Sequence, residues 1–183
     1  MTWRGRTSIP DRLWSCVVYI LPLIEVFVLG IFLIAKFPII GLFYVPLFPV
    51  MYVYAFLESQ IPYFSFMVFL ALYFFLVRNG KINHFIRFNI MQALMLSIVV
   101  QLFLTIMELL NLLYIPSMYS LLVSGIPQGS SASAFILEII LDAIFIGIVA
   151  SCLYSIVQAL RGVYAEIPVI SEAAYVHSRS CCD

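Results

Sequence analysis

The chain has 183 residues, of which 64% are hydrophobic and 10% are charged, and its nine basic and nine acidic residues cancel. Soluble domains carry about 25% charged residues, so this composition argues against a water-soluble globular fold, and the balanced charge gives no indication of nucleic-acid binding. Long uncharged apolar tracts alternate with short charged clusters, a pattern typical of an all-α polytopic membrane protein.

The N-terminal segment 1–12 is basic and ends in residues that suit the start of a helix. Ser8 can cap the helix, Pro10 suits its first turn, and Asp11 takes the acidic third position of a capping box. Few residues precede the first apolar tract, so no cleavable targeting segment is expected. If the protein works in an organelle, we expect it to be encoded there or to be a mature form.

The first apolar tract, 13–35, carries Glu25 as its one charged residue. At ~1.5 Å per residue, a helix of this length crosses the ~30 Å hydrocarbon core. We expect Pro22 to kink the helix or to be accommodated by its neighbours, because proline removes one backbone hydrogen bond.

The next segment, 37–57, is uncharged and long enough to span, but Pro38, Pro46 and Pro49 interrupt it. Backbone exposed to lipid cannot leave polar groups unsatisfied. We therefore predict a broken segment that is interfacial or re-entrant and packs against a helix.

Three further apolar tracts read as spans, at about 60–77, 88–113 and 134–160. A short basic connection, 78–87, separates the first two, and an uncharged loop, 114–133, precedes the last. The tail, 161–183, is polar. These ranges give a membrane domain at 13–160.

The positions of the basic residues decide whether the broken segment crosses. If it does not, eight of the nine lie on one side of the membrane, and Lys36 is the exception. If it does cross, the N-terminal and central basic clusters fall on opposite sides. The positive-inside rule therefore favours a bundle of four transmembrane helices with both termini on the positive side.

Polar residues also occur inside the predicted spans. In the third span they recur at helical spacing on one narrow face, at Ser97, Gln101, Thr105, Glu108 and Asn111. Glu138 and Asp142 share a face of the last span, in the half of the membrane away from the basic side. We define a candidate polar path by Gln101, Thr105, Glu108, Glu138 and Asp142. Such residues line a wet cavity, contact a partner, or form hydrogen bonds within the bundle.

Other features are less specific. Ala143, Gly147 and Ser151 form a small-residue pattern that permits close helix packing, and we favour packing within the chain over oligomerisation. The four cysteines do not suggest a disulfide framework. No catalytic set, phosphate-binding loop or metal-ligand pattern is recognisable, so no enzymatic activity and no cofactor or metal is predicted.

Several motifs occur in an order that is informative together. They are Ile9-Pro10-Asp11-Arg12-Leu13, Tyr19-Ile20-Leu21-Pro22-Leu23-Ile24-Glu25 with Gly30, Pro46-Leu47-Phe48-Pro49, Val77-Arg78-Asn79, Phe85-Ile86-Arg87-Phe88-Asn89-Ile90-Met91-Gln92-Ala93 and Ile167-Pro168-Val169-Ile170-Ser171-Glu172-Ala173-Ala174. Over nearly the whole chain this order resembles the twenty-kilodalton Tic family, the channel-type subunit of the translocon at the inner envelope membrane of chloroplasts. The stretch 78–93 is its most specific part.

The resemblance implies four transmembrane helices with both termini in the stroma, and a role in importing precursor proteins across the inner envelope. It implies other translocon subunits, precursor polypeptides and membrane lipids as partners. The absence of a transit peptide resembles a plastid-encoded or cyanobacterial member, and in a cyanobacterium the termini would face the cytoplasm. The family supplies no catalytic residues.

A second candidate site consists of residues within the stretch that carries the resemblance to the Tic family. We define the basic-end motif as Arg78, Asn79, Arg87, Asn89 and Gln92. Arg87 can hold a phosphate or a carboxylate, and Gln92 can bond to another span. The motif either fixes the connection between the second and third spans or offers a docking surface to partners. A small-solute or ion carrier and a non-conducting assembly scaffold remain alternative functions.

Overall fold

The computed structural model describes residues 8–61, 63–78, 82–109, 132–165 and 167, without the side chains of 108 and 132–138. Every regular element in these ranges is helical. The helices are α1 (Ile9–Val17), α2 (Ile20–Val26), α3 (Ile31–Lys36), α4 (Pro38–Tyr44), α5 (Phe48–Gln60), α6 (Phe64–Leu72), α7 (His84–Leu109) and α9 (Ala132–Arg161). A 3₁₀ turn, Val45–Leu47, joins α4 to α5, and a π-helical segment, Tyr73–Val77, extends α6.

The predicted helix start at Ser8 is confirmed. The capping box between Ser8 and Asp11 is present, with the Ser8 backbone N–H donating to Asp11 Oδ2 over 3.1 Å. Asn83, just before α7, donates to the same oxygen over 2.7 Å. The Ser8 side chain also bonds to Asp11. Together with the bonds from the Ser8 backbone and from Asn83, and more than either of them, it holds the pKa of Asp11 below its usual value. The capping box thus also joins the start of α1 to the start of α7.

The first apolar tract is not one continuous helix, because it divides into α1, α2 and α3. Pro22 has no N–H to give to the Val18 carbonyl, and the Leu21 N–H occupies that carbonyl instead, over 3.3 Å. The break therefore falls at Val18 and Tyr19, before the proline. A second break lies at 27–30.

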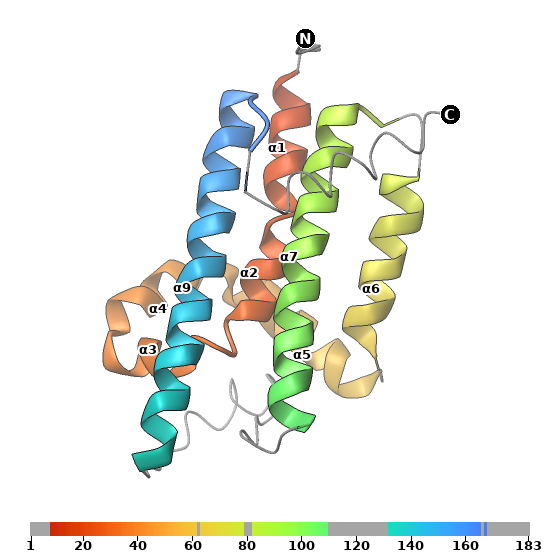
Figure 1. Cartoon of the computed structure of the whole chain (residues 1–183). Helices are drawn as coiled ribbons and strands as arrows, with labels where there is room; N and C mark the ends of the chain where they lie inside the picture. Colours follow the sequence, from red (N-terminus) through yellow and green to blue (C-terminus); the bar gives the residue numbers. More distant parts are fainter. Residues whose placement is uncertain (1–7, 62, 79–81, 110–131, 166, 168–183) are drawn as a thin grey trace.

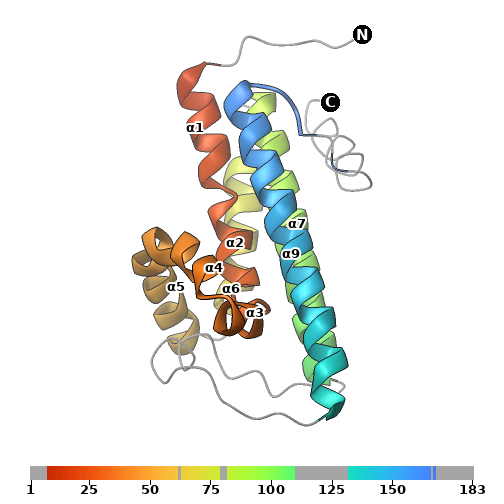
Figure 2. The same cartoon turned by 90° about the vertical axis from the view of Figure 1, so that its left-hand side faces the viewer.

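The core of the molecule is made by α1 and α2 packed against α7 and α9 (Figure 1). Its buried side chains include Leu23 and Leu29, Leu96 of α7, and Phe145 of α9. Figures 1 and 2 show that α7 and α9 both run along the length of the molecule. The π-helical extension of α6 packs on α7 around Val77, Phe88 and Leu94.

In the segment 37–57, each of the three prolines lies at the start of a helical piece. Pro38 begins α4, Pro46 lies in the 3₁₀ turn, and Pro49 lies in the first turn of α5. At these positions the missing N–H costs no helical hydrogen bond. Figures 1 and 2 show α3, α4 and α5 in one half of the molecule, away from the end at which α1 begins.

Three helical stretches are long and apolar enough to cross a membrane: Pro38–Gln60, His84–Met107 and Ile139–Arg161. The stretch Phe64–Val77 is apolar but shorter. The first of the three combines α4, the 3₁₀ turn and α5, so its length does not describe a straight helix. The predicted count of four spans therefore stays a prediction.

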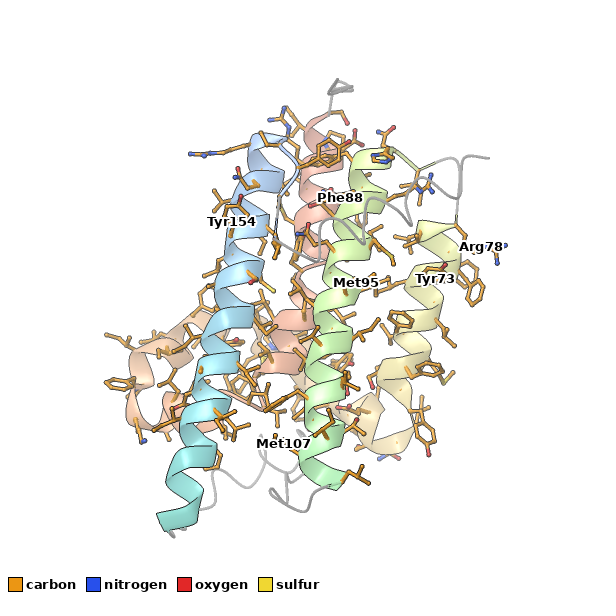
Figure 3. All side chains as sticks on the ribbon, viewed as in Figure 1. Tyr73, Arg78, Phe88, Met95, Met107 and Tyr154 are labelled. Atoms are coloured by element: carbon orange, nitrogen blue, oxygen red, sulfur yellow. The ribbon has the colours of Figure 1, made fainter. Side chains whose placement is uncertain are left out.

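The described arginines gather at one end of the bundle, whereas Lys36 ends α3 in the other half of the molecule. Arg12 Nη1 of α1 donates to the carbonyl of Leu160 over 3.3 Å, which places it beside Arg161 at the end of α9. Figure 3 shows Arg78 and Phe88 toward this same end, with Met107 toward the other. The guanidinium of Arg78 lies 5.6 Å from the centre of the Phe74 ring, a cation–π distance. We call this the basic end.

The expectation that the small-residue face of α9 packs within the chain is wrong for the residues described. Ala143 and Gly147 are exposed, and a Cβ placed at Gly147 would meet no described atom within 4 Å. The close approach occurs instead at Gly30, where a Cβ would overlap the ring of Phe145. Because Gly30 lies in the turn after α2, this glycine lets the chain reverse directly against α9.

Candidate functional site: two buried polar clusters

A buried hydrogen-bond network links α1–α2 to α7 near the basic end. The hydroxyl of Tyr19 lies 3.1 Å from both Asn89 Oδ1 and Gln92 Oε1, and all three side chains have 0% exposure. Asn89 Nδ2 also donates to the Phe85 carbonyl over 2.8 Å. We call Tyr19, Asn89 and Gln92 the tyrosine network. Each of these polar groups has a partner, as buried polar groups require.

The chain returns to this network after α9. Gly162, with φ of 72°, ends α9 and turns the backbone toward α7. Gln92 Nε2 then donates to the carbonyl of Ala165 over 3.2 Å, and Ala165 has 0% exposure. The ring of Tyr164 packs edge-on against Phe85 and Phe88, with centroids 5.3 and 5.1 Å away. The beginning of the predicted tail is therefore part of the bundle.

The structure divides the basic-end motif into an internal and an external part. Asn89 and Gln92 belong to the tyrosine network, and Arg87 is 2% exposed. Arg78 is exposed and lies at the end of the π-helical segment. Asn79 lies outside the described residues. Three of the five side chains are thus inside the fold and do not offer a surface to another molecule in this arrangement.

A second polar cluster lies deeper in the bundle, around Glu25 of α2. Its side chain is 3% exposed, and Tyr54 of α5 donates a hydrogen bond to Glu25 Oε1 over 3.1 Å. Ser97 and Gln101 of α7 lie close enough to this carboxyl group to interact with it electrostatically. We call these four residues the glutamate cluster. It connects three separate elements of the chain through one carboxyl group.

The members of the candidate polar path have different surroundings. Gln101 belongs to the glutamate cluster, whereas Thr105 is exposed and donates to the Gln101 carbonyl of its own helix over 2.8 Å. Asp142 of α9 is half-buried. Glu108 and Glu138 lie on α7 and α9, but their side chains are outside the description. The polar face of α7 therefore begins inside the bundle at Ser97 and reaches its surface at Thr105.

Sequence reasoning missed the tyrosines that complete both clusters. Tyr19 and Tyr54 were part of a general excess of aromatic residues, which in membrane spans serve first as packing or lipid-facing groups. A signal was nevertheless present at Glu25, since a lone carboxyl group in an apolar span needs a partner. Among the described residues, no group of three or more metal-ligating side chains occurs.

The fold and these clusters define an apolar, all-helical protein with helices long enough to cross a membrane and with buried polar contacts between them. Residues 6–174 match the family model described as chloroplast import apparatus Tic20-like. The chain is 36% identical over 169 residues to a Tic20 family protein of Synechocystis sp., covering 92% of this chain and 93% of the relative. The chain belongs to the Tic20-like family.

Two further relatives come from plastid-bearing eukaryotes. The chain is 31% identical to the Tic20 family protein Ycf60 of Cyanidium caldarium, covering 94% of this chain and 76% of the relative. It is 29% identical to the chloroplastic protein TIC 20-II of Arabidopsis thaliana, covering 92% of this chain and 72% of that protein. The similarity thus extends over nearly all of this chain in cyanobacterial and plastid relatives.

Proposed function

We propose that this protein is a membrane subunit of a protein translocon. It acts without enzymatic activity of its own, and its partners are other translocon subunits, precursor polypeptides and lipids. The match of residues 6–174 to a chloroplast import family carries the proposal. The apolar helices, and polar side chains placed within them, support it. The location would be the chloroplast inner envelope, or the cell membrane in a cyanobacterium.

The proposed topology has four spans, with both termini on the stromal or cytoplasmic side. It assigns α1 with α2, α6 with its π-helical extension, α7, and α9 to the four predicted spans at about 13–35, 60–77, 88–113 and 134–160. The gathering of Arg12, Arg78 and Arg161 at one end supports this topology, because positive residues favour the inner side. The position of α4 and α5 in one half of the molecule supports a re-entrant or interfacial segment.

Single-cysteine labelling at positions 44–49 tests the topology. In a background without the native thiols, a membrane-impermeant maleimide should label this segment, if at all, from the side opposite Arg12. A cysteine at Arg78, which is exposed at the basic end, is the control and should be labelled from the other side. Labelling of both positions from one side would contradict the four-span arrangement.

Crosslinking to a precursor stalled in transit tests the translocation role. A photo-reactive residue at Thr105, which is exposed on the polar face of α7, should crosslink to the precursor. The same probe at Leu102, which is 59% exposed on the same helix but apolar, is the matched control and should label lipid. Equal labelling at both positions, or labelling at Leu102 only, would count against a polypeptide path along this face.

A non-conducting assembly scaffold is the second candidate. Burial of Arg87, Asn89 and Gln92 favours it, because these family-matched residues serve the internal architecture of the chain. Purified protein in planar bilayers should then show no conductance. Depletion of the protein from the membrane should cause a larger complex to dissociate. Conductance that changes when Asp142 or Gln101 is replaced would instead favour a channel or a solute carrier.

A further inference from the structure

The glutamate cluster contains two buried oxygen atoms without a hydrogen-bond partner. Glu25 Oε1 accepts from the Tyr54 hydroxyl, but Glu25 Oε2 has no partner among the described atoms. Ser97 Oγ is in the same condition, and its side chain is 4% exposed. Both side chains are more than nine-tenths buried. Native proteins rarely leave such groups unsatisfied, so these two oxygen atoms require a hydrogen bond.

Among the residues that the structure describes, the groups that interact with Glu25 supply no positive charge. On α5, Tyr54 and Glu58 interact with it, and Glu58 is a second carboxyl group. On α7, the neighbouring groups are Ser97 and Gln101, which do not ionise. On α9, the residues buried in the same core cluster as α2 include the apolar Leu141, Phe145 and Ile148, and the carboxyl group of Asp142 is half-buried on the same helix. A charged carboxylate here would lie among apolar and neutral groups and near a like charge, which is strongly unfavourable.

We propose that Glu25 is a proton-binding site whose carboxyl group is neutral in the assembled bundle. The bound proton resides on Oε2 and is donated to Ser97 Oγ on α7, a neutral acceptor. Oε1 continues to accept from Tyr54. One proton thus satisfies the orphaned atoms, because it makes Oε2 a donor and gives Ser97 a bond. A metal ion fits less well, because Ca²⁺ needs six to eight oxygen ligands and Mg²⁺ near-octahedral geometry.

The proton has a structural consequence for the broken segment. The Tyr54–Glu25 bond is a polar link between α5 and α2, and α5 also contacts the core through apolar residues such as Met51, which is 0% exposed. Loss of the proton places a charge at the contact between α2, α5 and α7. Water must then reach the carboxylate, and displacement of α5 from α2 would admit it. Docking of α5 therefore depends on the protonation of Glu25. This inference does not depend on the translocation role.

Infrared spectroscopy tests the proton directly. Protein in liposomes near neutral pH should show the carbonyl stretch of a protonated carboxylic acid, and this band should disappear in Glu25→Gln and shift in Ser97→Ala. Glu58→Gln is the matched control and should retain the band. Absence of any protonated band that depends on Glu25 would overturn the proposal. A band that appears only after removal of Na⁺, K⁺ or Mg²⁺ would also overturn it, since a cation would then hold the site.

Thiol accessibility tests the coupling to α5. In a background without native thiols, the alkylation rate of Met51→Cys is divided by that of Val53→Cys. Val53 lies on the same helix and is 57% exposed. The ratio removes the pH dependence that both rates share because a thiol must ionise to react. The ratio should rise with pH, by at most about tenfold per unit, while Glu25 is protonated in the docked state and deprotonated in the undocked one, and it should level off once the docked state deprotonates as well. In Glu25→Gln it should stay low throughout. A ratio that rises equally in wild type and Glu25→Gln would refute the coupling.

Discussion

Replacing Gln92 with leucine is expected to lower the free energy of unfolding by about 1–3 kcal/mol. Gln92 accepts from the Tyr19 hydroxyl and donates to the carbonyl of Ala165, and all three residues are fully buried. Leucine preserves the size and helix propensity of the side chain but leaves the Ala165 carbonyl without its donor. Unfolding of the purified protein in mixed micelles, followed by circular dichroism, measures the change.

Gln158 provides the matched control for this substitution. It lies on α9 in the last turns before Gly162, and its amide donates to the Tyr154 hydroxyl over 3.2 Å at the surface. Gln158→Leu makes the same chemical change at the surface, where lipid or water can surround the new side chain. We therefore expect the free energy of unfolding to change by no more than about 0.5 kcal/mol. Equal losses in the two variants would show that the tyrosine network adds nothing particular to stability.

A double-mutant cycle separates the network from the simple loss of one side chain. Tyr19→Phe removes the hydroxyl that donates to Asn89 and Gln92. Because both substitutions disturb the same bonds, the double variant should be less destabilised than the sum of the single variants, by about 0.5–3 kcal/mol. Strict additivity would mean that the two side chains act separately.

Replacing Gly30 with alanine is expected to cost about 1–3 kcal/mol of stability through overpacking. The added Cβ would occupy the position of the Phe145 ring. That ring is 2% exposed and lies 6.3 Å from the ring of Tyr44, so the core leaves it little room to move. The same unfolding measurement applies, and a smaller replacement for the ring, Phe145→Leu, should partly rescue the variant.

Gly147→Ala is the control for Gly30→Ala. Both changes add one methyl group, but a Cβ at Gly147 would meet no described atom within 4 Å. In a helix interior, alanine also has the better propensity. We therefore expect a neutral or slightly stabilising effect at Gly147. A loss at Gly147 comparable to that at Gly30 would mean that another copy of the chain or a partner packs on this face of α9.

Much of the architecture could be predicted, because each prediction rested on local chemistry. The capping box at Ser8 and Asp11 depends on residues three apart, and the breaks at Pro38, Pro46 and Pro49 follow from their missing N–H groups. The position of the break between α1 and α2 could not be predicted from the sequence. Pro22 cannot donate to the Val18 carbonyl, so the helix ends there, before the proline itself.

The buried clusters were only half predictable. The polar residues of α7 could be recognised by their spacing, but their partners come from distant parts of the chain: Tyr19, Tyr54 and Ala165. Helical periodicity says which residues share a face, and it says nothing about which helix lies opposite. The contact between Gly30 and Phe145 could not be predicted for the same reason, whereas the small residues around Gly147 suggested a contact that the described residues do not make.

The return of the chain at Gly162 also constrains the order in which the protein can be built. Tyr19 is among the first residues to leave the ribosome, and Ala165, which completes the bonds of Gln92, is made only after α9. Until then, the amide of Gln92 lacks its carbonyl partner, however early α1 and α7 enter the membrane. The last helix and the four residues after it therefore close a structure begun by the first. A chain released before that point would keep an open polar site at its basic end, by which the insertion machinery or a membrane protease could distinguish an unfinished copy from a finished one.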